Sequence, residues 1–198
     1  HCEERQRRGN AAMEREILYL KVPSFPVAVE QLRDASLRGR PVAICATGPG
    51  RTLLQAVSPE ARREGLYKGM LRQEALRSCP GLRCLPPNPE LYMRITKFIF
   101  GLLATYTPLV EPIQPGALFL DISGTRRLFG PARDLAWKVR KEIRERVGLE
   151  LRLGLAANKL LSRIATRVSP ASSLCDVFPG EERHFLEPLD VKVLPAVR

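Results

Sequence analysis

The chain of 198 residues is long enough for one large domain or two small ones, and its 44% hydrophobic and 27% charged residues predict a buried core beneath a solvated surface. No apolar run approaches the roughly 20 residues of a membrane span and no secretory signal opens the chain, which disfavours a membrane-spanning or secreted protein. Lys and Arg number 32 against 21 Asp and Glu, a net charge of +11 that favours a nucleic-acid partner over a merely solubilising excess of charge.

The five cysteines predict reduced, mostly buried thiols in a cytoplasmic protein rather than a zinc site. Cys79 and Cys84 have a spacing that zinc sites sometimes use, but no second pair of Cys or His residues accompanies them. Residues 1–13, which end at Met13, are expected to be a disordered lead or residues appended upstream, and they carry no prediction about the fold.

Hydrophobic periodicity and turn residues predict six elements in the amino-terminal half. They are a buried strand at Ile17–Val22, a helix at Val27–Leu37, strands at Pro41–Ala46 and Thr52–Ser58, a short helix from Pro59 and a helix at about Leu71–Ser78. The turn sequence TGPG joins the two middle strands, which should therefore pair as a hairpin. Proline suits the first turn of a helix, which is why Pro59 marks a helix start.

Longer helices alternate with strands in the carboxyl-terminal half. The expected elements are a helix at Pro89–Tyr106, a strand at Ala117–Ile122, a helix at Pro131–Val147, a strand at Leu151–Ala156, a helix capped by Asn158 and a short strand at 173–178. Two long helices between strands of one sheet predict an α+β fold, with a mixed or antiparallel sheet and helices packed on one face. Residues 37–79 are expected to form a small inserted lobe.

Five segments, in their order and spacing, resemble the Y-family translesion DNA polymerases of the UmuC/DinB type. The segments read GLYKGMLRQEALRSCPGL, YTPLVEPI, LFLDISGT, GLELRLGLAANKLLSRIAT and FLEPLDVKVLP, and the similarity extends from about Ile17 to Arg198. The resemblance implies a polymerase right hand, with the palm at 14–24 and 89–178, the fingers at 25–88 and the start of a helix-hairpin-helix thumb at 179–198. The rest of the thumb and the little finger are expected beyond this chain.

Members of this family hold two magnesium ions with carboxylates, an Asp-x-Asp at the end of the first strand and an Asp-Glu before a later strand. On that pattern Lys21 and Pro23 replace the first pair. Gly116 and Ala117 replace the second pair. An ammonium about 4 Å from a divalent ion would repel it by several kcal/mol at an effective dielectric constant of about 20. The resemblance therefore implies no catalytic residues and no cofactor, with Mg²⁺ expected only if the enzyme is active through displaced ligands.

Other positions of the family's nucleotide pocket are partly retained. Pro26 stands at the position of the aromatic steric gate, and Pro59 replaces a Tyr that would reach the incoming triphosphate. Arg62 and Lys159 match the family's triphosphate-binding Arg and Lys, although each is also explained as an ordinary helical residue. The alternative of a substitute metal site rests on Asp121 and Glu30. Their side chains are the carboxylates that such a site would use.

Three functions follow from these residues. The first is a non-catalytic, ImuB-like member of the family that binds primer–template or damaged DNA during translesion synthesis. Its expected protein partners are a sliding clamp, a separate error-prone polymerase or a recombinase, in the bacterial cytoplasm near the nucleoid. The second is an active error-prone DNA polymerase with displaced metal ligands, and the third is a regulator that still binds a nucleotide.

Overall fold

The computed structural model describes residues 15–46, 48, 50–170 and 173–194. The chain divides into two compact units, one made of residues 1–21 and 100–198 and the other of Val22–Ile99. The predicted lead at 1–13, Glu14 and the last four residues of the predicted thumb lie outside the described residues. The names palm, fingers and thumb stay predictions. Helix α5 (Pro89–Leu103) crosses the boundary between the units after Ile99, so most of it lies in the second unit.

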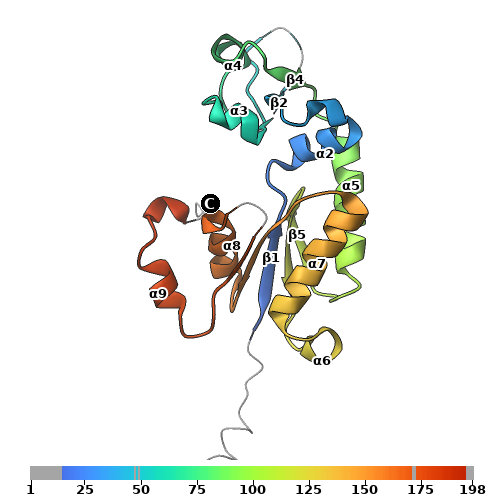
Figure 1. Cartoon of the computed structure of the whole chain (residues 1–198), viewed down its shortest axis with the longest axis vertical. Helices are drawn as coiled ribbons and strands as arrows, with labels where there is room; N and C mark the ends of the chain where they lie inside the picture. The colour runs from blue at the N-terminus through green and yellow to red at the C-terminus, as the bar shows by residue number, and fades with distance from the viewer. Residues whose placement is uncertain (1–14, 47, 49, 171–172, 195–198) are drawn as a thin grey trace, which may run out of the picture. The chain divides into compact units, whose positions relative to one another are not determined.

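The first unit is built on a five-stranded sheet with the order β5-β6-β1-β7-β8. These strands are β1 (Ile17–Lys21), β5 (Val110–Gln114), β6 (Ala117–Asp121), β7 (Arg152–Ala156) and β8 (Leu174–Asp176). The central strand β1, blue in Figure 1, pairs antiparallel with β6 and with β7, whereas β7 and β8 are parallel. The sheet is therefore mixed, as the alternation of helices and strands predicted.

One side of this sheet, which we call the leucine face, is formed by alternate residues of the three middle strands. The residues are Leu18, Leu20, Leu118, Leu120, Leu153 and Leu155, of which the first five have no solvent exposure. Their uniform size and burial give the first unit a continuous apolar core on that side.

The opposite side, which we call the mixed face, combines apolar, small and charged residues. Its members are Ile17, Tyr19, Lys21, Ala117, Phe119, Asp121, Arg152, Gly154 and Ala156. Helix α8 (Lys159–Val168) packs here, because a Cβ atom added to Gly154 would lie 2.0 Å from the backbone oxygen of Ser162. Gly154 therefore allows the close approach between helix and sheet.

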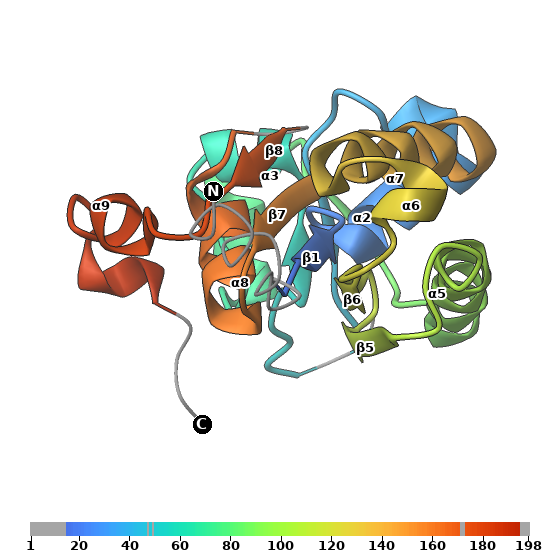
Figure 2. The same cartoon turned by 90° about the horizontal axis from the view of Figure 1, so that it is seen from below.

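Helices lie on both sides of the sheet. In Figure 2, α7 (Ala132–Val147) and α8 lie on opposite sides, so α7 covers the leucine face. The expectation that the helices pack on one face is wrong for α8, because Gly154 removes the side chain that would have kept a helix away from the mixed face. The first unit also contains α6 (Arg126–Phe129), α9 (Glu182–Leu186) and a 3₁₀ turn at Val191–Val193.

The second unit contains a three-stranded sheet with the order β3-β2-β4. The strands are β2 (Val42–Ile44), β3 (Ala56–Val57) and β4 (Arg83–Leu85), and β2 pairs antiparallel with β3, which confirms the predicted hairpin. The helices are α2 (Phe25–Arg33), α3 (Pro59–Arg63), α4 (Arg72–Ser78) and α5 (Pro89–Leu103), with a 3₁₀ turn at Ala35–Leu37. No helix in the described part of the chain is long and apolar enough to cross a membrane.

Several element boundaries differ from the predictions for local reasons. Helix α2 begins two residues before the predicted start and ends at Arg33, because the extended backbone of Asp34 stops it. The Asp34 side chain then accepts a hydrogen bond from the Ser36 amide and starts the following 3₁₀ turn. The strand predicted over Thr52–Ser58 contracts to two residues, with a single bridge from Leu53 to Leu71 outside it.

Candidate functional site

Lys21 and Ala117, two of the predicted metal-ligand positions, lie side by side at one end of the mixed face. They are register partners where β1 ends and β6 begins. Gly116 precedes Ala117 in the turn between β5 and β6 and has a φ of 76°, a left-handed conformation that glycine adopts without strain. Pro23 follows β1 and belongs to the second unit. Three of the four predicted positions are therefore brought together within the first unit.

Arg152 is the other register partner of Lys21, on the side of β7. Lys21 is thus flanked by Ala117 and Arg152 in one row across the sheet, and its neighbour on one side is a second cation. The Nε atom of Arg152 is buried and has no hydrogen-bond partner within the described part of the protein. Local sequence patterns do not single out Arg152. The alternation of leucines in LRLGLA places it on the same face as Lys21 only once β1 and β7 are paired.

Helix α8 adds further positive charge beside this row. The Lys159 ammonium stands 5.7 Å from the centre of the Phe119 ring and forms an ion pair with Glu111. Burial raises the pKa of the Tyr19 hydroxyl, and the positive charges of Arg163 and Arg167 partly offset that effect. The charges of these two arginines on α8 are therefore felt at Tyr19, in the centre of the mixed face.

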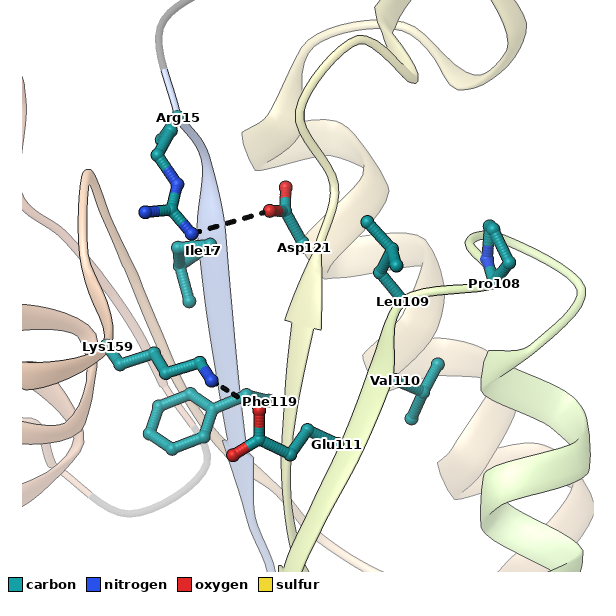
Figure 3. A pocket seen from close by; sticks show the side chains of 9 residues that line it. All are labelled: Arg15, Ile17, Pro108, Leu109, Val110, Glu111, Phe119, Asp121 and Lys159. Atoms are coloured by element: carbon teal, nitrogen blue, oxygen red, sulfur yellow. Dashed lines mark hydrogen bonds and ion pairs between the residues drawn. The ribbon is translucent and has the colours of Figure 1, made fainter.

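A pocket of about 330 Å³ opens over the mixed face and the edge strand β5. Figure 3 shows Lys159 and Glu111 pointing toward each other beside Phe119, with Arg15 reaching toward Asp121. The Arg15 Nη2 atom lies 3.8 Å from an Asp121 oxygen, and the other Asp121 oxygen accepts a hydrogen bond of 3.0 Å from the Ser123 amide. Both carboxylates of the pocket are thus balanced by cations.

The side chains at the predicted metal positions do not fit a divalent cation. Magnesium prefers oxygen ligands, and Lys21, Pro23, Gly116 and Ala117 supply neither a carboxylate nor any other side-chain oxygen. Within the described ranges, no group of three or more His, Cys, Asp or Glu side chains is arranged to hold a metal ion. The side chains of these four positions therefore provide no basis for a two-metal reaction.

Arg62, one of the two predicted phosphate contacts, has a structural partner in the second unit. Its Nη2 atom donates a hydrogen bond of 2.8 Å to the Ser24 hydroxyl, and that hydroxyl donates to the Val57 carbonyl at 2.8 Å. Ser24 has a φ of 48°, an uncommon conformation for a residue with a side chain. The two hydrogen bonds hold Ser24 where α2 begins, a role that sequence reasoning missed.

Pro26 and Pro59 both lie in the first turn of a helix. Pro26 is in the first turn of α2, and Pro59 opens α3 after Ser58, whose hydroxyl accepts a hydrogen bond of 3.1 Å from the Ala61 amide. Proline has no donor or aromatic ring, so neither residue can act as the side chain that the family carries at its position. Both prolines suit helix initiation.

Glu30, one member of the suggested substitute metal site, is a buried residue of the second unit. One of its carboxylate oxygens accepts a hydrogen bond of 3.1 Å from the Tyr92 hydroxyl, and the other lies 2.9 Å from Arg33 Nη2. Asp121 belongs to the first unit and contacts Arg15. Each carboxylate therefore has a cation of its own.

Comparison with known proteins places these features in a family. The pattern of the impB/mucB/samB family matches residues 20–167. The chain is 36% identical over 178 residues to DNA polymerase IV 2 of Mesorhizobium japonicum, covering 90% of this chain and 42% of that protein. It is 38% identical over 183 residues to DNA polymerase IV of Streptomyces coelicolor, covering 91% of this chain and 38% of that protein. The chain thus spans half or less of the length of these relatives.

Solved structures show the same fold at lower identity. DinB from Sulfolobus solfataricus superposes with a TM-score of 0.85 at 24% identity, over 92% of this chain and 54% of that one. An insertion ternary complex of the Dbh DNA polymerase gives a TM-score of 0.84 at 24% identity, with the same coverage. These similarities confirm the expected polymerase fold class. Because the family pattern covers most of the residues and the relatives agree with it, the chain belongs to the impB/mucB/samB family of Y-family DNA polymerases.

Proposed function

We propose that this chain is part of a non-catalytic, ImuB-like member of the family that binds DNA and serves as an accessory or scaffold in translesion synthesis. The observation that carries the proposal is the row of Ala117, Lys21 and Arg152, in which a lysine and an alanine stand at two metal-ligand positions and an arginine lies beside them. A cation at this place repels the metal ions that nucleotide transfer requires.

DNA binding is supported by charge and by the solved neighbours. The chain has a net charge of +11, and cationic residues gather on and around the mixed face. Two of the structural neighbours are ternary complexes of a DNA polymerase. The proposed partners are primer–template or damaged DNA together with a sliding clamp, a separate error-prone polymerase or a recombinase, in the bacterial cytoplasm.

Primer extension tests the proposal directly. The full-length protein that carries this chain is incubated with primed template, the four deoxynucleotides and Mg²⁺, beside the Streptomyces coelicolor DNA polymerase IV as a positive control. We expect no extension product from this protein, together with measurable binding to the same DNA by fluorescence anisotropy. Template-directed extension at a rate comparable with the control enzyme overturns the proposal.

A second candidate is an active polymerase with displaced ligands. It is favoured by the printed names of the relatives, which are DNA polymerases, and by the two carboxylates, Glu111 and Asp121, that line one pocket. A Glu111→Gln, Asp121→Asn variant separates the two candidates, since the loss of a Mg²⁺-dependent activity on this double change supports the enzyme.

Nucleotide binding through Arg62 and Lys159 is the third candidate, and it is tested without DNA. Titration of a labelled deoxynucleoside triphosphate, with and without Mg²⁺, is compared between the unchanged protein and an Arg62→Ala, Lys159→Ala variant. If the protein is a non-catalytic scaffold, neither the unchanged protein nor the variant should bind the nucleotide saturably. Saturable binding that the double change abolishes supports a nucleotide-responsive regulator.

A further inference from the structure

The row Ala117–Lys21–Arg152 reverses the charge that the family carries at this place. We infer that Lys21 and Arg152 form a metal-independent site for a backbone phosphate of DNA. This inference rests on the proposed DNA-binding function and assigns to it a specific contact. Where the family's carboxylates attract metal ions that in turn neutralise a phosphate, a lysine and an arginine contact the phosphate directly.

The geometry of antiparallel pairing brings the two cations together. Lys21 and Arg152 are register partners, so their Cα atoms are about 4.5–5.5 Å apart and their side chains leave the same face of the sheet. A lysine offers a compact point charge, whereas the planar guanidinium of an arginine offers two parallel donors to a phosphate. The pair therefore combines charge with directional hydrogen bonding to an anion.

The buried Nε atom of Arg152 is a second observation that fits an anion at this place. It has no hydrogen-bond partner in the described part of the protein, and an unpaired buried donor costs free energy. A phosphate that enters the row supplies an acceptor to the guanidinium to which this atom belongs. The third member of the row, Ala117, is fully buried and carries no charge that would compete with an anion for Lys21.

The surrounding charges favour an anion. The next row along the sheet contains Phe119 and Tyr19, and the Lys159 ammonium stands over the first of these rings. Two carboxylates near this face already have cationic partners: Glu111 is paired with Lys159, and Asp121 is paired with Arg15. Asp121 lies opposite Ile17, four residues along β1 from Lys21 and hence about 13 Å away. No carboxylate lies within the row itself.

Because no metal ion bridges the protein and the phosphate, DNA binding at this site should not require Mg²⁺. Binding to primed DNA should persist in EDTA, and added Mg²⁺ should weaken it by competing for the phosphates. Replacing Lys21 or Arg152 should reduce affinity to a similar extent for different DNA sequences, because a phosphate contact carries no sequence information.

Fluorescence anisotropy with primed DNA in EDTA, measured over a range of salt concentrations, tests the site. The Lys21→Gln, Arg152→Gln variant of the whole protein is expected to bind roughly tenfold more weakly. The affinity of this variant should also depend less steeply on salt. In a plot of log affinity against log salt concentration, the negative slope should become shallower by about 0.9, the value for one phosphate contact. The matched control is the Lys141→Gln, Arg144→Gln variant, which removes the same charge from α7 on the other side of the sheet.

The phosphate is located by neutralising one linkage of the primer at a time as a methylphosphonate. One position should weaken binding of the unchanged protein while leaving the affinity of the variant unaltered. The single Lys21→Gln variant keeps the test valid if the change at Arg152 disturbs folding, which circular dichroism reports.

The possible outcomes separate the two proposals. If the unchanged protein does not bind DNA even at low salt, the proposed DNA-binding function fails, and the phosphate site fails with it. If the protein binds DNA but the Lys21 and Arg152 variants match the α7 control in affinity and salt slope, only the phosphate site is overturned. Binding that requires Mg²⁺ also overturns it.

Discussion

The two faces of the five-stranded sheet carry different kinds of residues. The leucine face presents six side chains of one type, all buried. The mixed face presents glycine, alanine, aromatic and charged residues within the same strands. Because neighbouring residues of a strand point to opposite sides, one face can keep a uniform apolar core while the residues of the other face vary. The difference shows that the core residues and the residues of the candidate site occupy separate, alternating positions of the same strands.

The largest effect should follow from a change on the leucine face. Leu120→Ala removes a fully buried side chain and leaves a cavity, so we expect the free energy of unfolding to fall by about 3 kcal/mol. Lys21→Ala, on the other face, should change it by under about 1 kcal/mol. Urea denaturation of both variants measures the contrast, and equal losses would show that the two faces contribute alike to stability.

A somewhat smaller effect is expected where the mixed face meets α8. In Gly154→Ala the new methyl group would overlap the Ser162 backbone oxygen, so the helix must move away from β7. We expect a loss of about 2 kcal/mol and faster amide hydrogen exchange in α8. Gly101→Ala is the matched control, since a Cβ atom at that position meets no other atom within 4 Å. Unchanged exchange in α8 would contradict the close contact.

The smallest effect concerns a carboxylate on α7. The Tyr106 hydroxyl donates a hydrogen bond to Glu142 and lowers the pKa of this carboxyl group, with a further contribution from Arg146 at 3.0 Å. A lowered pKa in the folded state stabilises the protein above the unfolded pKa of about 4.3, and that contribution is lost as the pH falls through the folded value. Glu142→Gln should therefore lower the free energy of unfolding by about 1 kcal/mol near neutral pH. The loss should become progressively smaller as the pH falls below about 4.

The control for this change is Glu145→Gln on the same helix. Glu145 lies 3.9 Å from Lys141 and both side chains are exposed, so its removal should change stability by under about 0.5 kcal/mol at any pH. Denaturation midpoints measured from pH 3 to pH 7 compare the two variants. A loss for Glu142→Gln that does not depend on pH would exclude the carboxylate as its source.

Regular, strongly periodic segments were predictable from the sequence. The two long helices α5 and α7 and the strands β1, β6 and β7 were expected within a few residues of their ends, because apolar spacing reports which face is buried. Strand β5 was not expected, since its residues VEPIQ are mostly exposed and include a proline, and a bulge interrupts its pairing with β6. Strand β4 was missed because three residues show too little periodicity.

The candidate site could be predicted in part. The resemblance assigned Lys21, Gly116 and Ala117 to one place, and the structure shows two of them as register partners in the sheet with the third in the adjoining turn. Arg152 was missed because its position depends on pairing between strands more than 130 residues apart in the chain, which local patterns do not report. Glu111, the ion-pair partner of Lys159, was missed because it lies on the edge strand β5, which was not predicted.

If the proposed non-catalytic function holds, the backbone at Gly116 bears on whether successive single substitutions could introduce a metal site. An aspartate at this position would have to adopt a φ of 76°, which costs about 1–2 kcal/mol, or would force the turn before β6 to rearrange. Its carboxylate would gain no metal ion while the ammonium of Lys21, the register partner of the neighbouring Ala117, remained in place. Under the proposed non-catalytic function, a path to nucleotide transfer therefore passes through intermediates that gain no metal ion and lose stability, and the shape of one turn opposes it.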